Sequence, residues 1–156
     1  MKKIYPIKYS EYVETYSREY NIDTYLVYAI IKAESNFKEY AESTSNAIGL
    51  MQITKATAFE TAEKMELEVT KEDLFDPELN IKIGIKYFRI LLDKYENNIN
   101  LSIIAYNAGI GNVDKWIENG TIKEDGSDIE NVPFKETNNY ARKILRDYNI
   151  YKELYK

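Results

Sequence analysis

Glu34 is the side chain whose surroundings best suit acid–base chemistry. It lies at the end of residues 24–35, the most apolar predicted helix of the chain. Burial raises the pKa of a carboxyl group by disfavouring its charged form, and the negative C-terminal end of a helix dipole acts in the same direction. A carboxylic acid that stays protonated near neutral pH can serve as a general acid. The alternative is that Glu34 is an ordinary polar residue that frays into solvent.

Residues 43–52 form a polar and then small-residue segment that could line a cleft. The segment reads Ser-Thr-Ser-Asn-Ala-Ile-Gly-Leu-Met-Gln and ends where a further helix is predicted to begin. Its backbone can offer hydrogen-bond donors, and the amide of Gln52 suits hydrogen bonding to sugar or acetamido groups. The alternative is an ordinary loop that caps the next helix, with Met51 as a core residue.

A third segment, residues 105–113, combines two glycines with a tyrosine and an asparagine. Gly109 and Gly111 permit a tight turn and the close approach of another backbone. The hydroxyl of Tyr106 could hydrogen-bond the carboxyl of Glu34, and Asn107 offers an amide to a sugar. The same segment also fits a helix C-terminus followed by a turn, which explains the glycines better than it explains the Tyr-Asn pair beside them.

The residue types that the chain lacks exclude several classes of chemistry. The 156 residues include no cysteine and no histidine, which excludes a thiol nucleophile, a Ser-His-Asp triad and a zinc site built on Cys or His. Proton transfer therefore falls to carboxylates, lysines or tyrosines. The net charge of −5, with lysines interleaved among glutamates, predicts no nucleic-acid binding. Fifteen tyrosines suit a glycan groove, but most recur at helical spacing as core or boundary residues.

Hydrophobic periodicity predicts helices almost throughout the chain, with no strong strand alternation. Asp23 can cap the helix over residues 24–35, and Asp76 followed by Pro77 predicts the start of a long helix that ends near residue 94. Asn100 is the expected cap of the next helix. The other helices are expected at 9–20, 54–65, 101–107, around Val113 and Trp116, and at 138–148, with a loop at 120–134. The predicted fold is a compact all-α domain of about seven helices.

Taken together and in this order, these motifs resemble those of the soluble lytic transglycosylase family, whose domain has a goose-type lysozyme-like fold. The first matches are Glu-Ser-x-Phe at 34–37, Ala-x-Ser at 41–43 and Ala-x-Gly-Leu-Met-Gln at 47–52. The later matches are Asp76-Pro77, Asn80-Ile81, Gly84, Tyr87, the intact Ala-Tyr-Asn-Ala-Gly motif at 105–109, Val113, Trp116, and Glu136-Thr137 with Tyr140. Two positions depart from the family pattern: Asn46 replaces a common glycine and Lys55 a common proline.

The resemblance implies an enzyme that cleaves the glycan strands of bacterial peptidoglycan and leaves 1,6-anhydromuramoyl ends, with no metal or cofactor. Glu34 would donate a proton to the bond between N-acetylmuramic acid and N-acetylglucosamine and then accept one from the muramoyl C6 hydroxyl. Tyr106 would position or tune Glu34. The residues expected to bind the sugars are Ser35, Ser43, Gly49, Met51, Gln52, Asn107 and Tyr140.

The resemblance also implies how the chain is organised and where it acts. Residues 1–19 would form an N-terminal helix that packs on a lytic transglycosylase domain of residues 20–156, and this domain would contain an active-site groove. The substrate lies outside the cytoplasmic membrane. The expectation is therefore a monomer of the cell envelope, secreted or tethered to the membrane through a segment beyond these residues.

Two rival functions remain open on the residues alone. A lysozyme-type hydrolase uses a second carboxylate, about 5 Å or about 6.5–9.5 Å from the first. The chain has no Asp or Glu between Glu42 and Glu60, although Asp73, Asp76 or Asp114 could fold into range. The other rival, a non-catalytic wall-binding module, is expected to lack the acid, whereas Glu34 is present with its whole motif.

Overall fold

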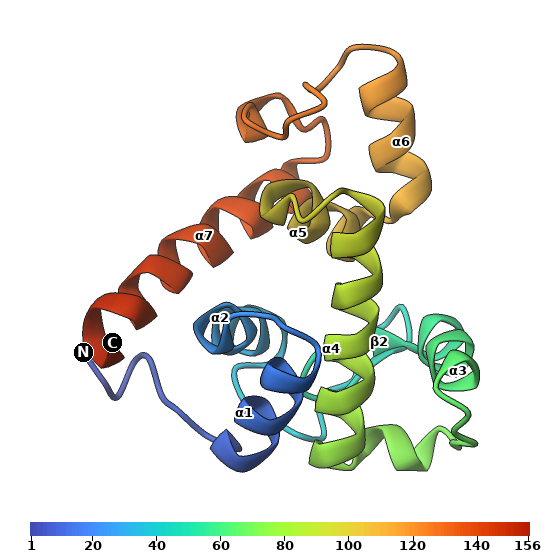
Figure 1. Cartoon of the computed structure of the whole chain (residues 1–156), viewed down its shortest axis with the longest axis vertical. Coiled ribbons are helices and arrows are strands. Elements are labelled where there is room, and N and C mark those ends of the chain that lie inside the picture. The colour runs from blue at the N-terminus through green and yellow to red at the C-terminus, as the bar shows by residue number, and fades with distance from the viewer.

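The computed structural model describes all 156 residues and consists almost entirely of helices (Figure 1). The elements in chain order are α1 (Ser10–Glu19), α2 (Thr24–Ser35), β1 (Ala47–Ile48), β2 (Ile53–Thr54), α3 (Lys55–Lys64), the 3-10 helix η1 (Glu72–Phe75), α4 (Pro77–Lys94), α5 (Ile99–Ala108), α6 (Ile110–Glu118), the 3-10 helix η2 (Ile129–Asn131) and α7 (Lys135–Tyr155). The seven α-helices confirm the predicted fold class.

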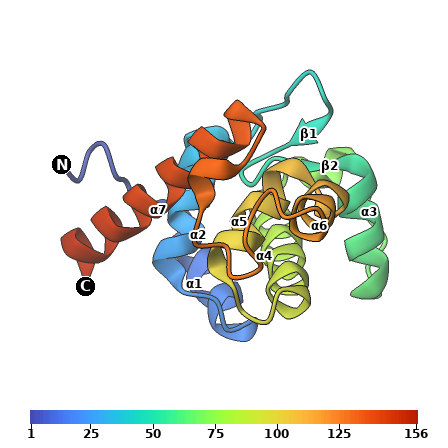
Figure 2. The same cartoon turned by 90° about the horizontal axis from the view of Figure 1, so that it is seen from above.

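Helix α2 is the centre of the fold because its side chains are apolar on every side. Residues 26–31 of α2 are all buried, and the helix packs against both α7 and α1 (Figures 1 and 2). Helix α4 packs on α1 and α5 and joins them to the same core. A smaller apolar cluster lies between α3, α4 and the hairpin of β1 and β2. The C-terminal end of α2, which carries Glu34, is therefore held by the main core.

Two of the three predicted helix caps are confirmed. Oδ1 of Asp23 accepts from the Tyr25 amide at 2.9 Å, and Oδ2 of Asp76 accepts from the Leu79 amide at 3.0 Å. Both side chains satisfy a backbone donor in the first turn of a helix.

The expected cap of α5 is wrong, because Asn98 and not Asn100 begins the helix. Oδ1 of Asn98 accepts from the amide of Leu101 at 2.9 Å. Asn100 instead donates from Nδ2 to the carbonyl of Gly126 at 2.9 Å, which ties the helix to the loop before η2. Either asparagine suits a cap by type, and both also bond the loop at residues 125–126, since Nδ2 of Asn98 donates to the carbonyl of Asp125 at 2.7 Å.

Two further elements differ from the sequence-based expectation. Helix α7 is longer at both ends than the predicted 138–148. Its C-terminal extension carries Tyr151, which is fully buried beside Tyr28, with ring centroids 5.8 Å apart. Residues 47–54 contain a short antiparallel hairpin in which Ala47 pairs with Thr54, and strands of two residues leave no alternation to detect.

The N-terminal residues share the main core. Val13 of α1 is fully buried, and Tyr5 is buried beneath Tyr151, with ring centroids 5.6 Å apart. The chain ends lie near each other at the end of α7 (Figures 1 and 2). The division into residues 1–19 and 20–156 stays a prediction. No helix combines the length and the apolar character that crossing a membrane requires.

Candidate active site

Glu34 lies in the last turn of α2 with its carboxyl only partly exposed. Its Oε2 accepts a hydrogen bond of 2.7 Å from the hydroxyl of Tyr140, on α7. Burial raises the pKa of Glu34 from its ordinary value of 4.5 to about 7, opposed by the Tyr140 hydrogen bond and assisted by the negative charge of Glu136. A pKa near neutrality suits a group that must both donate and accept a proton there.

The expected hydrogen bond between Tyr106 and Glu34 is not formed. The Tyr106 hydroxyl donates to the main-chain carbonyl of Met51 at 2.7 Å, and a phenol has only one hydrogen to donate. Tyr140, predicted as a sugar contact, is the tyrosine that holds the carboxyl. The pKa of both phenols is raised well above 10, mainly because the rings are buried and secondly because of the negative charge of Glu34. Both phenols therefore stay protonated at neutral pH.

The turn at residues 49–52 is fixed to α4 by the fully buried Asn80. Nδ2 of Asn80 donates to the carbonyls of Ile48 and Leu74 at 2.9 and 2.8 Å, and its Oδ1 accepts from the Met51 amide at 2.8 Å. Gly49 has φ +77°, and a Cβ there would lie 2.2 Å from Nδ2 of Asn80. The motif needs glycine at this position because Asn80 occupies the space that a side chain would take.

Three residues predicted to contact sugar instead hold the turn in place. The Met51 side chain is fully buried against Gly84, where a Cβ would come within 2.5 Å of its sulfur. The buried Ser35 hydroxyl donates to the carbonyl of Leu50 at 2.7 Å. Gly49 is buried between Asn80 and Leu74. The backbone carbonyl of Met51 accepts the hydrogen bond from Tyr106.

Ser43 orders the loop that leads into β1. Its Oγ accepts from the amides of Ser45 and Ala47 at 3.2 and 3.1 Å. The surface depression beside this loop is lined by Ser45 and Asn46 and not by Ser43. Asn46 has φ +64°, so asparagine supports the left-handed backbone that the family's usual glycine provides.

A pocket of about 260 Å³ brings together Gln52 and Asn107. Gln52 directly precedes β2, and Asn107 lies in the last turn of α5. The other residues that line the pocket are Ile53, Thr54, Thr57, Tyr87, Ala105, Tyr106, Ala108 and Gly109. Nε2 of Gln52 donates to the carbonyls of Ala41 and Gly49 at 3.0 and 2.9 Å, which leaves its oxygen without a protein partner. Gln52 and Asn107 were each predicted to bind sugars, and their place in one pocket fits a site for a polar ligand.

The orientation of Asn107 depends on Thr137, a residue whose role the sequence did not reveal. Oγ1 of Thr137 donates to Oδ1 of Asn107 at 2.7 Å, and Thr137 is buried in the first turn of α7. The amide nitrogen of Asn107 is then free to donate to a ligand, while Gln52 offers an oxygen. The Glu136-Thr137 pair in the family motif was the available signal for this contact.

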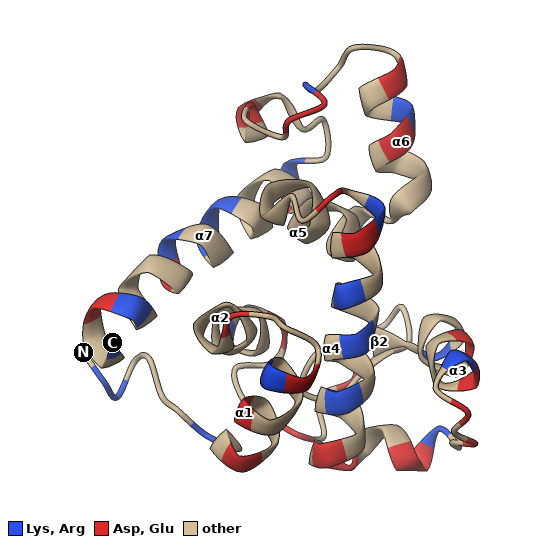
Figure 3. Ribbon diagram, viewed as in Figure 1, with Lys and Arg blue, Asp and Glu red and all other residues tan.

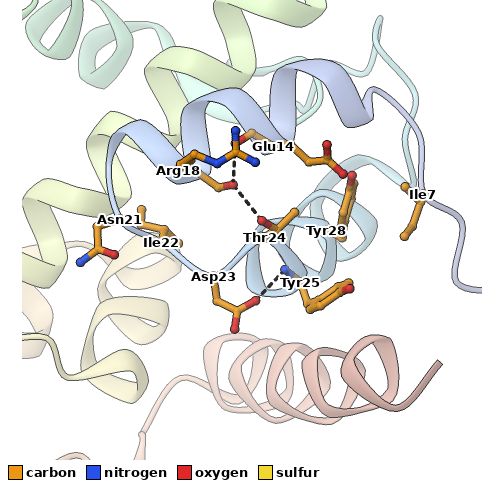
Figure 4. A pocket seen from close by; sticks show the side chains of 10 residues that line it. Ile7, Glu14, Arg18, Asn21, Ile22, Asp23, Thr24, Tyr25 and Tyr28 are labelled. Carbon is orange, nitrogen blue, oxygen red and sulfur yellow. Dashed lines mark hydrogen bonds between the residues drawn. The ribbon is translucent and has the colours of Figure 1, made fainter. Parts of the chain in front are cut away.

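A larger depression of about 520 Å³ lies at the opposite end of α2 (Figure 4). Thr24, Tyr25 and Tyr28 line it, and the buried Tyr28 hydroxyl has no hydrogen-bond partner there. Thr24 and Glu34 are ten residues apart, which is about 15 Å along a helix. This depression is therefore separate from the site at Glu34. No group of three acidic side chains is placed to hold a metal ion.

Comparison with known proteins identifies the class of this fold and site. The family model for the Transglycosylase SLT domain matches residues 11–129, and the chain belongs to this family of lytic transglycosylases. The soluble lytic murein transglycosylase of Escherichia coli K12 is 32% identical over 154 residues, which cover 97% of this chain and 24% of that protein.

Solved structures agree with the fold. The 70 kDa soluble lytic transglycosylase of Escherichia coli matches with a TM-score of 0.90 at 30% identity, over 98% of this chain and 25% of that one. An inactive glutamate-to-glutamine mutant of the lytic transglycosylase Slt from Pseudomonas aeruginosa matches with a TM-score of 0.88 at 28% identity, over 96% and 25%. The chain thus spans about a quarter of the length of these relatives.

Proposed function

We propose that this chain is a peptidoglycan lytic transglycosylase that cleaves the bond between N-acetylmuramic acid and N-acetylglucosamine. The observation that carries the proposal is Glu34, a carboxyl that accepts a hydrogen bond from the Tyr140 hydroxyl and whose pKa burial raises to about 7. Its charge acts on Tyr106, which lines the pocket of Gln52 and Asn107. The relatives named above are lytic transglycosylases, and a glutamate-to-glutamine change gives the inactive form of one of them. That inactivity fits a catalytic glutamate.

In the proposed reaction, protonated Glu34 gives its proton to the glycosidic oxygen as the bond to the muramoyl anomeric carbon breaks. Positive charge develops at that carbon, and the glucosamine leaves with the proton on its oxygen. The ionised Glu34 then takes the proton of the muramoyl C6 hydroxyl, whose oxygen bonds to the anomeric carbon. Glu34 ends the cycle protonated, and the product is a 1,6-anhydro sugar formed without water.

The other residues of the site have defined parts in this scheme. The Tyr140 hydroxyl stabilises the carboxylate formed after proton donation and lowers its pKa, so that burial does not lock the group in its neutral form. Tyr106 fixes the Met51 carbonyl and hence the turn that carries Gln52. Gln52 and Asn107 supply one acceptor and one donor for sugar acetamido or hydroxyl groups. A protein with this substrate acts in the cell envelope outside the cytoplasmic membrane, and we propose that it does so as a monomer that is secreted or membrane-tethered.

The test is digestion of purified peptidoglycan by the wild type and by Glu34→Gln, with the soluble fragments read by mass spectrometry. We expect 1,6-anhydromuramoyl ends, one water lighter than hydrolytic ends, from the wild type and none from the variant. Reducing ends would instead identify a lysozyme-type hydrolase. A wild type that binds insoluble peptidoglycan but releases nothing would indicate a wall-binding module.

A further inference from the structure

The open end of the hairpin of β1 and β2 holds a depression of about 440 Å³ next to the pocket of Gln52 and Asn107. Its volume lies within the range of about 300–1,000 Å³ that is typical of ligand pockets. Thr54, the last residue of β2, lines both the depression and the pocket. The two hollows are therefore neighbours along the hairpin, and one extended ligand can occupy both.

Two residues of the depression, Asn46 and Lys55, lie opposite each other across the hairpin. In the antiparallel register Ala47 pairs with Thr54, so Asn46 and Lys55 stand one step beyond the last pair. They are also the two positions at which the chain departs from the family pattern, with asparagine in place of a glycine and lysine in place of a proline. Both line the depression. The departures thus gather beside the candidate site and give it two side-chain donors that glycine and proline lack.

The ammonium of Lys55 is held over an aromatic ring and not by a carboxylate. Its Nζ lies 5.6 Å from the centroid of the Phe59 ring, one turn further along α3. The acidic residue that follows it most closely in the chain, Glu60, pairs with Lys64 at 3.9 Å. Residues 43–54 carry no charged side chain, so the ribbon at β2 is tan in Figure 3, and Lys55 is the only charged residue that lines the depression. Its three N–H groups are therefore available to a ligand.

The other side chains of the depression match a neutral sugar. Ser45, Asn46 and Thr54 carry hydroxyl or amide groups, which both donate and accept hydrogen bonds, as the hydroxyl groups of a sugar do. Ala56 and Phe59 add apolar surface that can cover the C–H face of a sugar ring. An anion offers only acceptors and would meet a single positive charge here.

We propose that this depression binds a further sugar of the glycan strand, next to the sugars held at Gln52 and Asn107. The inference rests on the proposed function and adds a subsite for the same substrate. Lys55 donates from its ammonium, and Asn46 from its amide, to hydroxyl or acetamido oxygens of that sugar. Asn46 can take this part because it also adopts the left-handed backbone, with φ +64°, that glycine usually provides.

The two positions allow a test in which the protein keeps its fold. Asn46→Gly suits the positive φ. Lys55 is the first residue of α3, where proline is favoured because the backbone amide has no partner within the helix. Thr54 has φ −69° and ψ 150°, an extended conformation that suits a residue before proline. The double variant Asn46→Gly/Lys55→Pro should therefore fold, and it removes both donors.

The assay is isothermal titration calorimetry with peptide-free oligomers of two to six N-acetylglucosamine units. Every protein carries Glu34→Gln so that no oligomer is cleaved, and the control Lys64→Gln also removes one positive charge from α3. We expect the double variant to bind the dimer as the Glu34→Gln protein does. It should bind the hexamer about tenfold more weakly, the equivalent of about 1.4 kcal/mol, which is the scale of one hydrogen bond from a charged donor. The control should match the Glu34→Gln protein at every length.

The outcomes separate this inference from the proposed function. A wild type that releases nothing in the digestion of peptidoglycan refutes the proposed function itself. If digestion succeeds, the inference is overturned when no oligomer binds, or when the double variant has an unchanged Kd at every length. A loss that is as large for the dimer as for the hexamer, or that Lys64→Gln reproduces, also overturns it, because the effect would not belong to one distal sugar. Circular dichroism melts of each protein establish that folding is retained.

Discussion

The raised pKa of Glu34 predicts that its negative charge destabilises the fold above neutral pH. The carboxyl binds its proton more tightly in the folded state, with a pKa of about 7, than at its ordinary value of 4.5. For an acid with a raised pKa, stability is unaffected below about pH 4.5, decreases as the pH rises toward 7, and stays reduced above it. Glu34→Gln removes the charge and should remove this loss.

The size of the effect follows from the shift. About 2.5 pKa units at about 1.4 kcal/mol each give about 3 kcal/mol. The free energy of unfolding of Glu34→Gln, relative to that of the wild type, should therefore increase by about 3 kcal/mol between pH 4.5 and pH 8. Taking the difference between two proteins at each pH cancels the titration of the other groups.

The assay is urea unfolding followed by circular dichroism at pH 4.5, 6 and 8. Glu63→Gln, an exposed residue of α3, serves as the control, and its stability should stay within about 0.5 kcal/mol of the wild type at each pH. A Glu34→Gln advantage that is the same at all three pH values would show that burial does not hold the carboxyl neutral. The acid role of Glu34 at neutral pH would then lack its physical basis.

Three further predictions address the neighbours of Glu34. Tyr140→Phe removes the hydrogen bond that lowers the Glu34 pKa. We expect kcat to decrease about tenfold and the alkaline limb of the kcat/KM–pH profile to move to higher pH. An unchanged profile would contradict the contact. Gly49→Ala places a Cβ 2.2 Å from Asn80 at φ +77°. It should lower the free energy of unfolding, measured with urea, by at least about 2 kcal/mol. The control Gly111→Ala, at a position with open space around it, should change the free energy of unfolding far less. Thr137→Val removes the hydrogen bond that orients the Asn107 amide and should raise KM about two- to tenfold with little change in kcat. Thr137→Ser keeps the hydroxyl and should have the KM of the wild type. A loss confined to kcat would refute the positioning role.

The elements and the candidate acid could be predicted from the sequence because their signals are local. The apolar run at residues 26–31 identifies a buried helix, and Asp23 and Asp76 identify helix starts through hydrogen bonds to residues two and three positions away. Glu34 follows from this logic, since a carboxyl at the end of a buried helix is desolvated whatever else surrounds it. The end of α5 at Ala108 was likewise predicted from the glycine that follows it.

The partners of these residues were decided by the tertiary structure. A hydroxyl donates one hydrogen to the acceptor that the fold brings nearest, so Tyr106 binds Met51, 55 positions away, and Tyr140 binds Glu34, 106 positions away. Asn98 and not Asn100 caps α5, and both asparagines bond the loop at residues 125–126, contacts that lie more than twenty residues away along the chain. Periodicity reports which face of a helix is buried, but it does not report which atoms of another segment lie opposite that face, and hydrogen bonds depend on those atoms.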